Sequence, residues 1–332
     1  MIYKVKPTRV YRSYYGGKNL DKMSGKHTAE NDRFPEDWLC SVTQAFNPGR
    51  NIKNEGLSVI DNGRYLVDVI NENKREMLGD SEHMSLLFKL LDSAERLVIQ
   101  VHPTNEFARK YFNSEFGKTE SWYILNDGGY VYIGFKPHIT KEYFVKLFNR
   151  QDISAMLECL HKFEVRKRDI IFVSGGVPHA IGAGCFLAEL QEPTDLMVIP
   201  ERITPSGIVL ADEKLHGGLG FDKMFDCFCF EGLNRDETYT KYFKRPQQVN
   251  DNEKEIINTS MTDKFTLSEI EIKGSYVKSL NDYAIALVLT GEGKCNGISL
   301  KSYDRFFIPF NEKNLNFSGN MKVLLCQPSI IH

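Results

Sequence analysis

Two apolar segments in the middle of the chain carry polar side chains where a buried strand would normally carry aliphatic ones. Segment 97–101 (LVIQV) contains Gln100 and is followed by His102, and segment 120–125 (ESWYIL) opens with Glu120. Gln100 and His102 stand two positions apart, so a strand would direct both side chains to the same face. An amide oxygen, an imidazole and a carboxylate together are groups that bind divalent metal ions.

A fourth polar candidate, His179, follows a later apolar segment. Within 168–184 (RDIIFVSGGVPHAIGAG), a strand-like run passes into Gly-Gly-Val-Pro immediately before this histidine. Glycine permits a tight turn and proline fixes the backbone, so we expect the imidazole to be held rigidly at a strand end. The four side chains favour zinc with one open coordination position. The spacing is only suggestive by itself, because a single histidine on a strand is more often a core or surface residue than a ligand.

The composition limits the class of protein. The chain has 332 residues, 42% of them hydrophobic, and a net charge of -2, which suits two globular domains and argues against nucleic acid as a partner. No N-terminal secretory segment is recognisable, and no run of about 18 apolar residues is present that would span a membrane. The seven cysteines include no CxxC pair. We therefore expect reduced thiols in a cytoplasmic protein without membrane contact.

The patterns of apolar residues predict a β-rich chain with two helical stretches. Residues 71–97 have apolar residues at helical spacing up to LLFKLL, and residues 140–165 read as two short helices with Thr140 as an N-cap. Elsewhere short β-type segments alternate with glycine, proline and asparagine, which is typical of sandwiches and barrels. The polar segment 243–260 is interpreted as a linker or as a long loop that opens the last domain.

Several motifs resemble those of type I mannose-6-phosphate isomerases, which are zinc enzymes of the cupin superfamily. The resemblance covers roughly residues 10–235 and continues weakly to the end of the chain. The segments that carry it are QVHP (100–103), FGKTESWYIL (116–125), GGVPHAIGAG (175–184) and ELQEPTDL (189–196), together with YGGKNL (15–20) and EDWLCS (36–41).

The resemblance implies a mainly β fold of two cupin-like (jelly-roll) β-barrels, with the two helical stretches as insertions. We predict a catalytic cupin domain over residues 1–240 and a C-terminal cupin-like structural domain over 241–332. No histidine lies between His216 and His332, so a metal site in the second barrel would lack imidazole.

The resemblance also implies an activity, the interconversion of mannose 6-phosphate and fructose 6-phosphate through a cis-enediol. The family's zinc ligands fall on Gln100, His102, Glu120 and His179, which predicts one zinc ion per chain. A divalent ion can stabilise the enediolate charge, and a base must reach the carbon-bound proton. The expected partner is a small-molecule sugar phosphate, bound to a monomer or a homodimer.

Three further residues acquire roles through the resemblance, each with a structural alternative. Lys118 is expected near the substrate, on its phosphate, unless it is a solvated surface lysine. Glu189 resembles the family's active-site glutamate, and its alternative is a carboxylate in a structural ion pair. Asp195 matches an acidic position near the substrate, although EPTD also has good turn chemistry.

Two departures from the family keep a second function open. The family has an arginine shortly after the position of Glu189, where this chain has Ile199; the nearest arginine is Arg202, either catalytic or on the surface. Asn47 stands where the family often has a histidine, and an asparagine cannot act as a base. The alternative is a metal-binding cupin that acts on, or only binds, a different sugar or sugar phosphate.

Overall fold

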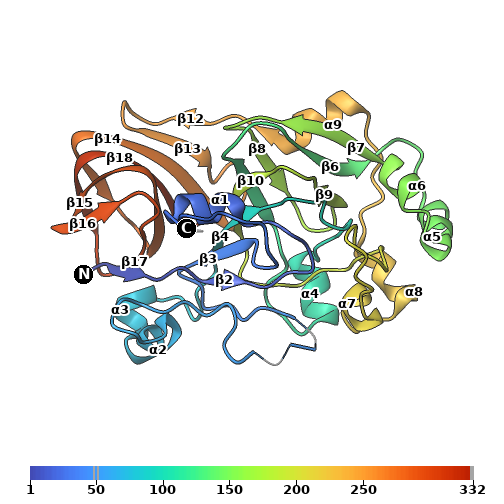
Figure 1. Cartoon of the computed structure of the whole chain (residues 1–332), viewed down its shortest axis with the longest axis horizontal. Helices are drawn as coiled ribbons and strands as arrows, with labels where there is room; N and C mark the ends of the chain where they lie inside the picture. Colours follow the sequence, from blue (N-terminus) through green and yellow to red (C-terminus); the bar gives the residue numbers. More distant parts are fainter. Residues whose placement is uncertain (48, 51, 330–332) are drawn as a thin grey trace.

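The computed structural model describes residues 1–47, 49–50 and 52–329, and its strands form three antiparallel sheets (Figure 1). The seven-stranded sheet has the order β11-β8-β5-β10-β4-β3-β2. Its strands are β2 (Arg9–Val10), β3 (Glu36–Leu39), β4 (Leu87–Asp92), β5 (Glu120–Ile124), β8 (Ile170–Val173), β10 (Phe186–Gln191) and β11 (Phe243–Lys244). The three-stranded sheet, of order β7-β6-β9, consists of β6 (Gly129–Phe135), β7 (Leu160–Val165) and β9 (His179–Ile181).

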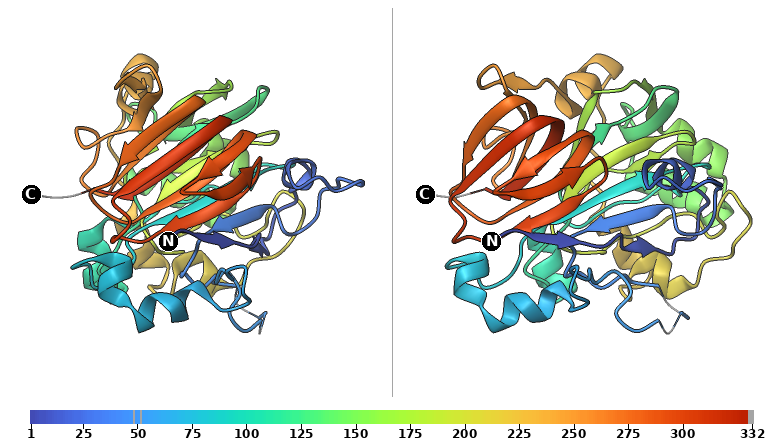
Figure 2. Two further views of the ribbon diagram at one scale, coloured as in Figure 1. Left: turned by 90° about the vertical axis from the view of Figure 1, so that its left-hand side faces the viewer. Right: turned by 60° about the vertical axis from the view of Figure 1, so that its left-hand side comes forward.

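The third sheet has eight strands and occupies one end of the molecule. Its order is β1-β17-β15-β18-β14-β13-β12, with β16 paired to β15. Figure 2 shows its long strands curving side by side. They are β1 (Tyr3–Val5), β12 (Gln247–Gln248), β13 (Glu253–Ile257), β14 (Phe265–Ser279), β15 (Ala284–Cys295), β16 (Ile298–Lys301), β17 (Arg305–Ile308) and β18 (Asn314–Pro328). The mainly β architecture that the sequence predicts is confirmed.

Short helices surround the sheets, and several of them cover the end of the molecule opposite the eight-stranded sheet (Figure 1). They are α1 (Lys18–Met23), α2 (Leu66–Glu72), α3 (Lys74–Leu78), α4 (Asn105–Tyr111), α5 (Lys141–Arg150), α6 (Ile153–Glu158), α7 (Asp212–His216), α8 (Phe221–Met224), a 3₁₀ turn (Phe225–Cys227) and α9 (Arg235–Tyr242). Among the described residues, no helix has the length and apolar character needed to cross a membrane.

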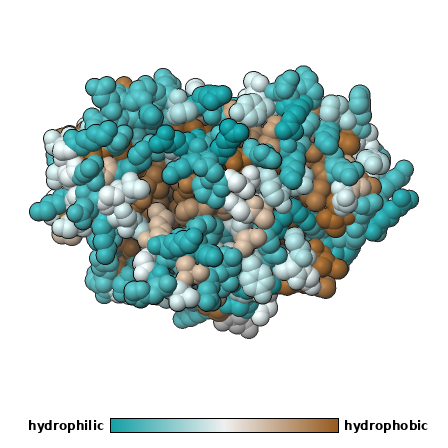
Figure 3. Space-filling model, turned by 45° about the horizontal axis from the view of Figure 1, so that its top comes forward, coloured by the Kyte–Doolittle hydropathy of each residue, from teal (hydrophilic) through white to brown (hydrophobic). Residues whose placement is uncertain are grey.

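Three buried clusters explain how the sheets stay together. Trp122 and Ile171 of the seven-stranded sheet pack against Val131 and Ile133 of the three-stranded sheet. A second cluster fills the inside of the eight-stranded sheet. The largest joins both halves, with side chains of β4 packed with those of β14, β15 and β18. The face seen in Figure 3 is mostly hydrophilic, with apolar atoms visible in hollows between polar side chains.

The prediction of a helix over 71–97 is wrong for its second half. Residues 66–72 and 74–78 are helical, but Leu87–Asp92 forms β4, with all six residues buried. β4 pairs with β10 along one edge and with β3 along the other, and the burial of all six residues shows that both of its faces are covered. A strand buried on both faces is apolar at consecutive positions, and periodicity cannot distinguish such a run from a buried helix.

Two other segments differ in detail from their predictions. Residues 140–165 contain the two short helices, and the hydroxyl of Thr140 accepts a hydrogen bond from the backbone N–H of Tyr143 as an N-cap does. The segment ends, however, in strand β7. Residues 243–260 are not a simple linker, because β11 pairs with β8 and β12 pairs with β13. The chain therefore crosses between the two large sheets at residues 245–246.

Candidate functional site

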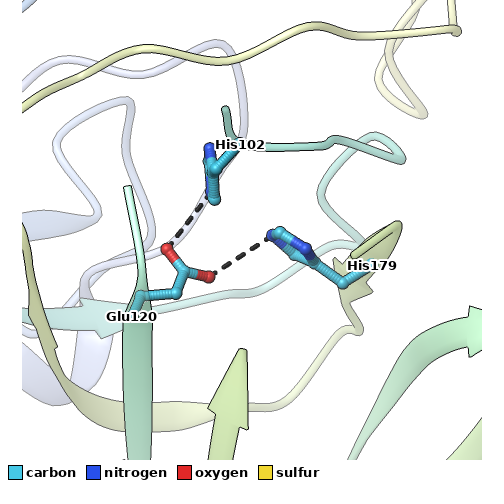
Figure 4. Close-up of side chains that lie close together, drawn as sticks. All are labelled: His102, Glu120 and His179. Carbon is cyan, nitrogen blue, oxygen red and sulfur yellow. Dashed lines mark ion pairs between the residues drawn. The ribbon is translucent and has the colours of Figure 1, made fainter. Parts of the chain in front are cut away.

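His102, Glu120 and His179 lie together inside the molecule, with their candidate ligand atoms within 4.8 Å of one another. Glu120 begins β5 and His179 begins β9, so the two sheets that pack face to face each contribute one residue. Nε2 of His102 is 3.2 Å from one carboxylate oxygen of Glu120, and Nε2 of His179 is 3.3 Å from the other. Figure 4 shows both rings directed at the carboxylate. At most 1% of each of these side chains is exposed.

The second nitrogen of each ring contacts a backbone carbonyl. Nδ1 of His102 lies 2.9 Å from the oxygen of Leu196, and Nδ1 of His179 lies 2.8 Å from that of Val177. Burial lowers the pKa of His102 and lowers that of His179 to about 3, so both rings are neutral near pH 7. A neutral ring that donates from Nδ1 presents the lone pair of Nε2, as metal-binding histidines do.

The donor set fits a divalent metal ion. The Nε2 atom of His179 is buried and has no hydrogen-bond partner among the described residues. Gln100 lies beside it, because the backbones of Gln100 and His179 exchange two hydrogen bonds of 2.9 and 3.0 Å. Nitrogen and oxygen donors of this kind suit zinc, although the arrangement by itself does not select one metal.

Glycines allow the loops of the site to approach one another closely. A Cβ atom at Gly117, just before Lys118, would lie 2.4 Å from the carbonyl oxygen of Pro103. A Cβ at Gly175, in the turn before His179, would lie 2.7 Å from the same oxygen. The QVHP, GKTE and GGVPH motifs therefore pack around one backbone carbonyl, and only glycine leaves room for this.

Lys118 is buried in the cluster, so the surface alternative for this residue is wrong. Its Nζ lies 2.9 Å from Nε2 of His102, 3.2 Å from Glu120 and 3.8 Å from Glu189. Glu189, in β10, also pairs with Lys89 at 3.2 Å. Burial and the nearby charge of Glu120 raise the pKa of Glu189. Glu189 thus takes part in ion pairs and at the same time lines the cavity beside the cluster.

Asp195 lies on the wall of the same cavity and is held by an arginine that sequence reasoning missed. Arg12 is buried, and its guanidinium lies 3.1 Å from Asp195, 3.0 Å from Glu36 and 5.1 Å from the centre of the Trp38 ring. Asp195 also accepts a hydrogen bond from the backbone N–H of Phe46. A weak signal was present, because Arg12 lies two positions from both Val10 and Tyr14, and in an extended segment this spacing would put it on the same face as these apolar residues.

The structure does not bring Arg202 to the cavity. Its guanidinium pairs with Asp212 at 2.7 Å, lies over the rings of Phe148 and Phe221, and its side chain is 38% exposed. Ile199, in contrast, is buried and lines the cavity.

Asn47 also lies outside the described cavity lining. Its amide nitrogen donates to the backbone oxygen of Tyr11 and to the carboxylate of Glu55. Asn47 therefore holds a loop in place.

Two neighbouring cavities adjoin the site. The inner one has a volume of about 50 Å³, and the outer one, of about 480 Å³, shares the wall residues Asp195, Met197 and Lys214 with it. Charged side chains of both signs line the inner cavity. They are Arg12, Glu36, Lys89, Arg96, Lys118, Glu189, Asp195 and Lys214.

Comparisons with known proteins agree on one family. Residues 26–123 match the catalytic domain of type I phosphomannose isomerase. The mannose-6-phosphate isomerase of Streptococcus mutans is 25% identical over 96% of this chain and 95% of its own length. The mannose-6-phosphate isomerase ManA of Bacillus subtilis is 34% identical over 54% of this chain and 55% of its own length.

Solved structures show the same fold. The crystal structure of a mannose 6-phosphate isomerase from Bacillus subtilis superposes with a TM-score of 0.77 at 22% identity and covers 98% of this chain and 99% of its own. A putative mannosephosphate isomerase from Archaeoglobus fulgidus superposes with a TM-score of 0.75 at 16% identity and covers 99% of this chain and 98% of its own.

Fold and site together define a mainly β protein that shares the fold of a solved mannose 6-phosphate isomerase and has a candidate metal centre between its seven-stranded and three-stranded sheets. Residues 26–123 match the type I catalytic domain and nearly the whole chain is similar to a mannose-6-phosphate isomerase, so the resemblance seen in its motifs is confirmed.

Proposed function

We propose that this chain is a zinc-dependent aldose–ketose isomerase that interconverts mannose 6-phosphate and fructose 6-phosphate. The observation that carries the proposal is the buried cluster of His102, Glu120 and His179 beside a cavity lined by further ionisable groups. The match of residues 26–123 to the type I catalytic domain and the activity named for the relatives support the same reaction.

The metal centre of the proposal consists of Gln100, His102, Glu120 and His179, with one zinc ion per chain. The two neutral imidazoles, the carboxylate and the adjacent amide fit such an ion. When bound, the ion supplies Lewis-acid stabilisation of the negative charge that develops on the sugar oxygens.

In this proposal, residues around the metal centre transfer the proton and bind the sugar oxygens. The reaction moves one proton between C1 and C2 of the sugar, and a carboxylate on the cavity wall can take and return it. Glu189 lines the cavity and lies 3.8 Å from Lys118, so we assign this proton transfer to it. Lys118, with three hydrogens on Nζ, is placed to donate to sugar oxygens at the reacting end.

Asp195 acts in this proposal through Arg12, whose position it fixes. Arg202, proposed from the sequence as a catalytic residue, lies outside the cavity lining, and its role is tested below. The division into a catalytic domain over residues 1–240 and a structural domain over 241–332 remains part of the proposal.

A second function is favoured by one observation, the isoleucine at position 199 on the cavity wall. A protein of this family that lacks the usual arginine there can be a metal-binding cupin that acts on, or only binds, a different sugar or sugar phosphate. Turnover separates the two functions.

The decisive experiment measures conversion of mannose 6-phosphate to fructose 6-phosphate by the zinc-loaded protein, with a chelator-treated sample as control. We expect chelator-sensitive turnover at about 1 s⁻¹ or more, an ordinary enzymatic rate. Absence of turnover in protein that holds a full equivalent of zinc would overturn the assigned substrate and favour the second function. Turnover that survives removal of the metal would overturn the zinc dependence.

A further inference from the structure

Lys214 lies at the junction of the two cavities and lines both of them. It belongs to the short helix α7 and is half-buried. Among the described residues, no carboxylate lies within ion-pair distance of its Nζ. A partly desolvated ammonium group without a counter-ion is unfavourable, and an anionic ligand would relieve this.

The other cations of the inner cavity are already paired. Arg12 contacts Asp195 and Glu36, and Arg96 makes two hydrogen bonds of 2.6 and 2.8 Å to Glu201. Lys89 lies between Glu36 and Glu189, and Lys118 contacts Glu120. Within the described chain, Lys214 is therefore the lining cation whose charge is available to a ligand.

The surroundings of Lys214 also lower the pKa of its ammonium group. Burial lowers its pKa, and the positive charge of Arg12 lowers it further, while Asp195 acts in the opposite direction. A partly desolvated ammonium group that a neighbouring cation also disfavours is a position where a bound anion is stabilised.

Lys214 and Lys118 line the same inner cavity, and Lys118 contacts His102 and Glu120 of the metal cluster. A row of alternating charges runs from Asp195 to Glu120, with successive contacts of 3.0 to 3.8 Å. In order, its members are Asp195, Arg12, Glu36, Lys89, Glu189, Lys118 and Glu120. A sugar phosphate carries its reacting carbons and its phosphate at opposite ends of the molecule, and the inner cavity offers it the metal cluster beside Lys118 and a separate unpaired cation, Lys214.

We propose that Lys214 binds the phosphate group of the substrate. The inference rests on the proposed function, since it assigns one end of the same site. The phosphate is thereby assigned to Lys214 and not, as the motif resemblance implied, to Lys118, because Nζ of Lys118 is surrounded by His102 and Glu120 of the metal cluster. The phosphate enters through the outer cavity, which is the larger of the two.

The test compares wild type, Lys214→Met, Lys214→Arg and a control, Lys223→Met. Lys223 belongs to the neighbouring helix α8, pairs with Asp226 and is not among the described residues that line either cavity. We expect Lys214→Met to raise the KM for mannose 6-phosphate by about tenfold or more, the effect of losing one charge-assisted hydrogen bond. Its effect on kcat should be smaller. Lys214→Arg should restore part of the loss, and Lys223→Met should resemble wild type.

Calorimetric titration of the zinc-loaded proteins with inorganic phosphate keeps the test independent of turnover. Weaker phosphate binding by Lys214→Met than by wild type supports the subsite even if mannose 6-phosphate is not turned over. Equal phosphate affinity in the two proteins overturns the inference, as does a KM unchanged by Lys214→Met. A circular dichroism melt of each variant verifies that it is folded.

Discussion

Arg12 and Asp195 stand 183 positions apart in the sequence, yet their side chains meet in a two-pronged ion pair. Both guanidinium nitrogens, Nη1 and Nη2, lie 3.1 Å from an oxygen of the carboxylate. Pairs of this geometry are among the stronger polar contacts in proteins, because two charge-assisted bonds fix the orientation of both groups. The pair joins the N-terminal segment to the loop that follows β10 and thereby closes one wall of the cavity.

The Arg12 pair predicts a large loss of stability in Arg12→Met. The substitution leaves the buried carboxylate of Asp195 without its partner and removes one of the cations beside Glu36. Breaking a buried pair from one side costs about 3–5 kcal/mol, which urea unfolding would measure. In the double variant Arg12→Met/Asp195→Leu, we expect part of this loss to be recovered. A loss below about 1 kcal/mol in the single variant would contradict the buried pair.

The metal centre predicts that His102→Ala and His179→Ala lose their metal and remain folded. Each variant removes one of the two imidazoles that face Glu120. Elemental analysis of dialysed protein should show much less zinc than the single equivalent expected in wild type. His216→Ala is the control, since the described partner of this ring is the backbone N–H of Gly218. A full equivalent of zinc in either ligand variant would falsify the assignment.

Arg202→Ala is the variant for which motif resemblance and structure predict different results. A catalytic arginine would lower kcat at least about tenfold when removed. A half-buried arginine that pairs with Asp212 and lies over two phenylalanine rings contributes about 1 kcal/mol or less to stability. We expect the second result, with kcat within about twofold of wild type. A tenfold loss of kcat in a normally stable variant would show that Arg202 reaches the substrate.

Glu253, in the C-terminal sheet, predicts a pH-dependent contribution to stability. Its carboxylate is 2.7 Å from Nζ of Lys278 and accepts hydrogen bonds from Ser268 and Tyr276. Burial alone would raise its pKa, but Lys278 and the hydroxyl of Ser268 lower it below its usual value. A depressed folded-state pKa stabilises the protein above the unfolded pKa of about 4.3, and this stabilisation is lost as the pH falls through the folded value.

Glu253→Gln should therefore lower the free energy of unfolding by about 1–3 kcal/mol at pH 7 and by progressively less below about pH 4. Urea unfolding at several pH values provides the comparison. Glu292→Gln, at an exposed position of β15, is the matched control. A difference between Glu253→Gln and wild type that stays constant down to acid pH would contradict the depressed pKa.

The buried ion pair between Asp37 and Arg305 indicates that the two large sheets depend on each other for stability. Asp37 belongs to β3 and Arg305 to β17, and their side chains meet at 2.5 Å with at most 1% exposure. Asp37→Asn leaves a buried guanidinium uncompensated, so a loss of about 3–5 kcal/mol is expected. Thermal unfolding followed by both fluorescence and circular dichroism should give a single transition in wild type. In Asp37→Asn this transition should occur at a lower temperature. Unchanged melting would argue against this contact.

The local sequence predicted a feature correctly where the residue type itself limits what the position can do, as for metal ligands and for glycines in turns. An amide, two histidines and a carboxylate on strand-like segments indicated a metal centre before any tertiary contact was known, and the structure brings His102, Glu120 and His179 together. The glycines of GGVPH signalled a tight turn, and the structure shows that a Cβ at Gly175 would lie too close to a backbone carbonyl. The short strands were recognisable from their β-type residues and the turn residues that separate them.

Long-range contacts decided the rest, because the physical partner of each group lies far along the chain. Leu87–Asp92 became a strand only because β3 and β10 cover both of its sides. Lys118 is buried at the site and Arg202 is half-buried away from it, although both are isolated cations in the sequence. The position of Arg12 on the cavity wall depends on Asp195, which no local pattern connects to it. The sequence by itself thus determined which chemical groups are present and which turns and strands form, whereas burial and charge pairing were decided only when distant segments packed together.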